Sequence, residues 1–254
     1  MTIGCKEATK DENKSEKTEA VGVTDTIITI TPLEGSPQFK DAKLSHPGGE
    51  LLEVEPGLID FNFKVENYEL GAQTENAGEN GLANSGQGQH IHFILNNMPY
   101  SAHYESEFSR EIEEGEHVLL AFLSRSFHES VKNEDAFVIR KIKAGNPSET
   151  EQLDVDFSAQ HLFYSRPKGT YSGEDTKKIL LDFFLLNTNL SQEGNKVQVS
   201  INSGEKFLIT DWAPHVIEGM PMGENTIQIT LVDETLTPIP GPFNSVTRTI
   251  TLEE

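Results

Sequence analysis

Short runs in which apolar and polar residues alternate dominate the pattern along this chain. In residues 196–202, KVQVSIN, a valine or isoleucine stands at every second position. This period of two is typical of a β-strand with one face covered and the other in solvent. No long segment carries a helical period, so the pattern predicts an all-β chain. The segments of strand character are 25–30, 59–66, 89–95, 117–123 and 136–143, then 161–165, 178–186, 196–202, 206–212, 225–232 and 246–252.

The two sets of strand segments resemble each other in the same order. The similar pairs are 42–49 with 162–169, 58–67 with 180–189, 90–97 with 197–204 and 113–123 with 221–231. Ordered matches of this kind favour an internal duplication. We therefore predict two tandem immunoglobulin-like β-sandwich domains, with a small barrel for each as the alternative. The predicted parts are a tether at 1–23, domain 1 at 24–145, a linker at 146–157 and domain 2 at 158–254.

Two histidines stand one residue apart in GQGQHIHFILNN, residues 86–97. Alternation places His90 and His92 on the same face of a strand. The pairing of the repeats sets them at the positions of Val197 and Val199. The sequence thus predicts that the first domain carries two imidazoles where its sister carries core aliphatics.

A third histidine follows after the Asn-Asn pair at 96–97, in NNMPYSAHYE. A turn of two or four residues would place His103 on the same face as His90 and His92, whereas a turn of three would not. His117 would start a neighbouring strand, and His128 falls in the loop SRSFHES. Since neutral imidazole suits both copper and zinc, these five histidines form a candidate Cu or Zn site. The alternative is a histidine patch held by local hydrogen bonds.

The long loop at 71–88 precedes the histidine strand, whereas its counterpart in the second repeat is only SQEGN. Long ordered loops are often functional, so the loop favours a site in the first domain.

The net charge of −21 limits the kinds of molecule that the chain could bind. Such a field repels nucleic acid, so no nucleic-acid partner is expected. Arg125, Arg166 and Lys168 are local positive groups that could contact an anion or a partner, the alternative being hydrogen bonds within loops. No G-x-S-x-G elbow, P-loop or calcium-loop spacing occurs, and we expect no enzymatic activity.

The only cysteine, Cys5, follows Thr2, Ile3 and Gly4, as at the end of a lipoprotein signal. The apolar stretch of such a signal would lie before the first printed residue. Residues 6–20 are polar and charged, which suits a disordered tether behind a lipidated cysteine. A chance cysteine in a floppy terminus is the alternative.

Several stretches together carry a family resemblance: NSGQGQHIHFILNNMPYSAHYE, FLSRSFHESVKN, YSRPKGTYSGEDTKKILLDFFLLN and EGMPMGENTIQITLVD. Over nearly all of residues 38–252 the chain resembles Bacteroidota envelope lipoproteins of unknown function, some of which carry the label phosphopeptide-binding protein. The resemblance implies lipidation at Cys5 and a place at the outer membrane or cell surface, with a periplasm-facing orientation as the alternative. It supplies no catalytic residues. We expect a non-enzymatic binding or accessory subunit beside an outer-membrane protein partner, and alternatively a copper- or zinc-binding envelope protein.

Overall fold

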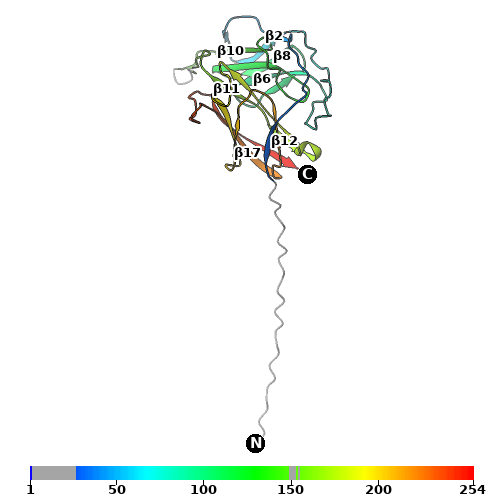
Figure 1. The fold of residues 1–254 in the computed structure, drawn as a ribbon. Helices are drawn as coiled ribbons and strands as arrows, with labels where there is room; N and C mark the ends of the chain where they lie inside the picture. Colours follow the sequence, from blue (N-terminus) through cyan, green and yellow to red (C-terminus); the bar gives the residue numbers. More distant parts are fainter. Residues whose placement is uncertain (2–26, 149–152, 154) are drawn as a thin grey trace.

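The computed structural model describes residues 1, 27–148, 153 and 155–254, and its regular elements are nearly all strands (Figure 1). This confirms the predicted all-β class. In the part of the chain that the structure describes, the one helix is the short 3₁₀ turn η2, Gly173–Thr176. Within the described residues, no helix has the length and apolar character needed to cross a membrane.

The second half of the chain forms a sandwich of two sheets around one core. Its larger sheet has the strand order β12-β18-β17-β14-β15, and its smaller sheet the order β1-β16-β13-β11. The strands are β1 (Thr29–Pro32), β11 (His161–Arg166), β12 (Gly169–Ser172), β13 (Ile179–Leu186), β14 (Lys196–Ile201), β15 (Lys206–Ile209), β16 (His215–Glu218), β17 (Gly223–Val232) and β18 (Ser245–Glu253). Alternate residues of β14 and β17 face the core, as the period of two predicts.

The first half repeats this arrangement. Its larger sheet has the order β3-β10-β9-β6-β7, and its smaller layer consists of the pairs β2-β5 and β4-β8. The strands are β2 (Lys43–Ser45), β3 (Leu51–Val54), β4 (Gly57–Asn62), β5 (Lys64–Glu66), β6 (His90–Leu95), β7 (Ser101–His103), β8 (Glu107–Ile112), β9 (Gly115–Ser124) and β10 (Phe137–Ala144). In each larger sheet the first pair is parallel, β3 with β10 and β12 with β18, and the other pairs are antiparallel.

The predicted match between β6 and β14 is shifted by one residue in the structure, as the registers of these strands with β9 and β17 show. Ile91 lies opposite Leu123 of β9, as Val197 lies opposite Leu231 of β17. Ile91, not His90, is therefore the counterpart of Val197. A slip of one residue exchanges the two faces of a strand, so the prediction that His90 and His92 replace core aliphatics is wrong.

A turn after β6 recurs after β14 and supports this register. Asn96 and Asn202 both adopt positive φ, at 53° and 52°. The backbone N–H of Asn96 donates to the carbonyl of Val118, and that of Asn202 to the carbonyl of Thr226. In return, the side-chain oxygen of Asn96 accepts a hydrogen bond from the N–H of Val118, and that of Asn202 from the N–H of Thr226, both at 2.8 Å. The two halves thus share a specific local structure as well as a strand order.

The larger sheet of the first half packs against the smaller sheet of the second half. Between them lies an apolar cluster, here named the interdomain core. It contains Ile94, Tyr100, Val118, Leu120 and Phe122 from the first half and Phe163, Phe184, Leu186 and Phe243 from the second. The ring of Trp212 meets Phe184 edge to face at 5.1 Å and so packs against the interdomain core. Strands β6 and β9 are consequently buried on both faces.

One strand crosses the predicted domain boundary. β1, Thr29–Pro32, pairs with β16 and so belongs to the smaller sheet of the second half. The prediction that domain 1 begins at 24 is wrong for this strand. Residues 2–23 of the predicted tether, Cys5 among them, and part of the linker at 146–157 lie outside the described residues.

Candidate functional site

The three histidines that meet in the structure are His90, His92 and His128. Strand β6 sends Ile91 and Phe93 into the core of the first half, and alternation turns His90 and His92 toward the second half. Both side chains are 0% exposed. His128 comes from the loop after β9, where it adopts a positive φ of 72°.

Three ring nitrogens converge on one point. His92 Nε2 lies 2.9 Å from His90 Nε2, and His128 Nδ1 lies 3.2 Å from His90 Nε2. All three nitrogens lie within 4.8 Å of one another. Ligand nitrogens around a tetrahedral zinc ion, at Zn–N of about 2.0–2.1 Å, are separated by about 3.3 Å. Small movements of the rings would therefore admit an ion between them.

The outer ring nitrogen of His90 is held in a way that presents its inner nitrogen, which accepts a hydrogen bond from His92 Nε2–H. His90 Nδ1–H donates to the carbonyl of Gly88 at 2.8 Å, so a neutral His90 offers its Nε2 lone pair to the site. His92 Nδ1 contacts Ser165 Oγ of the second half at 3.2 Å. Metal-ligating histidines commonly use the second nitrogen to bond a carbonyl or a similar group, which sets the orientation of the ring.

Tyrosine rings complete the surroundings of the cluster. The ring of Tyr100 stacks on His92 with centroids 3.5 Å apart and an angle of 12°. Tyr100 Oη lies 3.1 Å from His128 Nδ1, and the ring of Tyr104 lies 5.1 Å from that of His90. The sequence pattern indicates neither Tyr100 nor Ser165 as a neighbour of the histidines: Tyr100 reaches them through the connection between β6 and β7, and Ser165 through the packing of the two halves.

Burial keeps the three imidazoles neutral. Desolvation lowers the pKa of His90 to about 4, with smaller contributions from the charges of Arg166 and Lys168. Desolvation also lowers the pKa of His92 far below its usual value, followed by repulsion from His90 and His128. Desolvation is also the main cause that lowers the pKa of His128, followed by repulsion from the charge of Arg166. Neutral imidazole is the form that binds metals.

His103 does not join the cluster, and that prediction is wrong. It pairs with Ile91 rather than with His90 or His92, because five residues, 96–100, separate β6 from β7. An odd number reverses the parity of the pairing. His103 instead stacks on Phe108 with ring centroids 3.5 Å apart, on the side of the first core.

His117 is also remote from the site, and its role is structural. Its Nε2–H donates to the carbonyl of Glu113 at 2.9 Å, and its Nδ1 accepts from Asn96 Nδ2 at 3.0 Å. In the second half Asn225 takes its place, since Asn225 bonds Pro221 and Asn202. The predicted alignment of His117 with Asn225 is therefore reproduced, and the prediction of a metal ligand at His117 is wrong.

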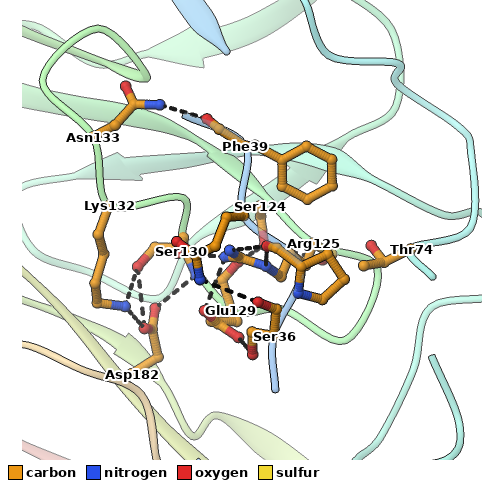
Figure 2. A network of polar contacts seen from close by, with 12 residues as sticks. Ser36, Phe39, Thr74, Ser124, Arg125, Glu129, Ser130, Lys132, Asn133 and Asp182 are labelled. Carbon is orange, nitrogen blue, oxygen red and sulfur yellow. Dashed lines mark hydrogen bonds and ion pairs between the residues drawn. The ribbon is translucent and has the colours of Figure 1, made fainter. Parts of the chain in front are cut away.

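The predicted anion contact at Arg125 is occupied internally (Figure 2). Arg125 is 3% exposed, donates to the carbonyls of Pro37 and Ser130, and pairs with Glu129 at 2.9 Å. Beside it Lys132 pairs with the buried Asp182 of β13. This network joins the segment after β1, the loop of His128 and the second half, and it leaves Arg125 with no open side for a partner.

Arg166 and Lys168 lie near the histidines instead of on an open surface. Arg166 is 8% exposed and donates to Tyr171 Oη at 3.0 Å. Lys168 Nζ donates to the carbonyl of Tyr100 at 2.7 Å and lies 3.9 Å from the centroid of that ring. Desolvation lowers the pKa of Lys168 to about 8. These two cations influence the site electrostatically without entering it.

Comparisons with known proteins give only distant structural matches. No family model and no curated protein matches the chain. Among solved structures, fibronectin(III)-like modules of Clostridium thermocellum CbhA match at 10% identity and a TM-score of 0.29, over 83% of this chain and 94% of that one. The Bacteroides ovatus protein SGBP-B, solved with a mixed-linkage heptasaccharide, matches at 8% identity and a TM-score of 0.23, over 88% and 70%. Escherichia coli alpha-2-macroglobulin matches at 12% identity and a TM-score of 0.23, over 86% of this chain and 22% of that one.

Proposed function

We propose that this chain is a non-enzymatic binding protein that holds a copper or zinc ion on His90, His92 and His128. The observation that carries the proposal is the convergence of three neutral imidazole nitrogens, all within 4.8 Å of one another. Imidazole is a good ligand for both metals. The ligands come from one strand and one loop of a packed scaffold, which suits retention of an ion.

The enclosure of the cluster favours binding over catalysis. His90 and His92 are fully buried, and the ring of Tyr100 covers one side of His92. A catalytic metal requires an open coordination position that substrate can reach. An enclosed ion would act as a stored or stabilising group.

Metal analysis of protein purified without a tag tests the proposal. The wild-type chain should bind added ion in stoichiometric amount and melt at a higher temperature, because binding to the folded state alone stabilises it. Replacing a direct ligand, His128→Ala, should weaken binding by at least about 100-fold, more than the loss typical of residues behind the ligands.

His103→Ala is the matched control, since it removes an imidazole of the same domain that lies outside the cluster. It should leave metal binding unchanged. The proposal would be refuted if added copper and zinc left the melting temperature unchanged, or if the His128→Ala variant bound metal as tightly as the wild type.

We further propose that the protein works in the cell envelope, anchored by acylation of Cys5 and positioned beside an outer-membrane protein. The Thr-Ile-Gly-Cys sequence, the polar residues after it and the family resemblance support this proposal. Stable attachment requires more than one acyl chain. Mass spectrometry of the N-terminus and a Cys5→Ser variant expressed with its full leader test the anchor. Copurification from native membranes tests the partner, and recovery of the protein alone would count against it.

A further inference from the structure

The charges around His90, His92 and His128 distinguish between candidate ions. We propose, on the basis of the metal-binding function above, that the site selects monovalent copper, Cu(I), over the divalent ions Zn(II) and Cu(II). The ligand type alone does not determine which ion the site prefers, because imidazole suits copper and zinc alike. The number and sign of the neighbouring charges determine this preference.

The ligands themselves contribute no negative charge. Within the described residues, the metal-binding group consists of the three histidines alone, without a carboxylate or a thiolate. A bound ion would thus keep its full charge in a site whose two strand histidines are 0% exposed. Transferring an ion from water into such surroundings is more unfavourable for a dication than for a monocation, since the Born energy grows with the square of the charge.

Two cationic side chains of the second half add to this preference. Arg166 Cζ and Lys168 Nζ lie 5.3 Å and 3.9 Å from the centroid of the Tyr100 ring, and that ring stacks on His92. Both donate to neutral oxygens, Arg166 to Tyr171 Oη and Lys168 to the carbonyl of Tyr100, so these bonds leave their charges uncancelled. At equal distance each cation repels a divalent ion twice as strongly as a monovalent one.

The number of available ligands points the same way. Three imidazole nitrogens converge, and stacking of Tyr100 on His92 covers one side of the site. Structural zinc sites are almost always tetrahedral with four ligands. Cu(I) has a filled d shell and is stable with two or three nitrogen ligands, and exclusion of water protects it from oxidation. The site thus provides the ligand number of Cu(I) without recruiting a fourth group.

Competition experiments on the full chain test this selection. Under anaerobic conditions, Cu(I) affinity is measured against a coloured Cu(I) chelator, and Zn(II) and Cu(II) affinities against chelators of their own. Cu(I) should bind in stoichiometric amount and at least about 100-fold more tightly than Zn(II), because both the charge and the ligand number favour it. Tighter Zn(II) or Cu(II) binding that His128→Ala abolishes would overturn the selection and leave the metal-binding function standing. Absence of binding by all three ions would overturn both.

A charge variant isolates the electrostatic part. Lys168→Met keeps the length of the side chain and removes its charge, so the preference for Cu(I) over Zn(II) should narrow by about tenfold. Lys206→Met, on the exposed end of β15, is the matched control and should leave the ratio unchanged. Near-UV circular dichroism of each variant establishes that the packing of Tyr100 is intact. A folded Lys168→Met protein with the wild-type ratio would contradict the electrostatic argument.

Discussion

The outer faces of β6 and β14 are equivalent in position and differ in polarity and burial. On β14 this face carries the half-buried Gln198 and Ser200, which is 9% exposed, and on the neighbouring strand β17 Gln228 is exposed. On β6 the corresponding positions are His92 and Ile94, both 0% exposed. The strands share a fold and a register, so their own sheets do not cause the difference. The cause is the second half, whose smaller sheet covers the face of β6, whereas on the corresponding face of the second half Gln198 stays half-buried and Gln228 exposed.

The comparison of the two halves also shows which histidine of the first half stands at the position of an aliphatic core residue in the second half. In β7 His103 lies opposite Ile91, and in β15 Ile209 lies opposite Val197. His103 therefore occupies the place of a core isoleucine. His90 and His92 belong to a different environment, the boundary between the halves, where polar groups of both halves can reach them.

The largest effect should come from a charge placed on the covered face. Leu120→Asp buries a carboxylate in the interdomain core and should destabilise the protein by at least about 4 kcal/mol. Gln228→Asp, at the equivalent position of β17, should change the free energy of unfolding by no more than about 0.5 kcal/mol. Urea denaturation measures both, and similar losses would show that the two faces do not differ as described.

A smaller contrast is expected at the histidine strand itself. In metal-free protein His92→Ala removes the stacking on Tyr100 and the contact with Ser165, and should lower the free energy of unfolding by about 2–4 kcal/mol. Gln198→Ala, its counterpart on β14, should cost no more than about 0.5 kcal/mol. Equal costs would indicate that the boundary leaves His92 as free as a surface residue.

The recurring turn offers a test of the shared structure. Asn96→Ala and Asn202→Ala each remove the same side-chain bond to a backbone N–H, and each should cost about 1–2 kcal/mol. The two values should agree closely, since the local geometry is the same in both halves. A large disagreement between the denaturation curves would argue against structural equivalence of the turns.

The stability of the protein should depend on pH because His103, unlike its counterpart Ile209, can be protonated. Desolvation lowers the pKa of His103 to about 4 in the folded protein, against about 6.5 in the unfolded chain. The unfolded state therefore binds the proton first, and the stability present above pH 6.5 is lost as the pH falls toward 4. His103→Ile, which copies the second half, should lose less stability over this window. An unchanged slope in urea denaturation across this pH range would contradict the assignment.

The sequence predicts the fold well where one face of a strand meets solvent. Val197, Val199 and Ile201 reveal the core of the second half through simple alternation, because the residues between them are polar. In β6 both faces are buried, so HIHFIL shows no clear period and the sequence pairing slipped by one residue. The sequence could not reveal the five-residue connection that turns His103 away. The contact of His92 with Ser165 depends on packing between the halves, and its stacking on Tyr100 depends on the path of the connection after β6; no local pattern encodes either.

Anomalous diffraction from a crystal loaded with copper under reducing conditions tests the central claim most directly. The account predicts one strong peak at the copper edge within bonding distance of His90 Nε2, His92 Nε2 and His128 Nδ1. A crystal with ordered density for these three side chains and no peak among them, or with its strongest peak at His103 or His117, would contradict it.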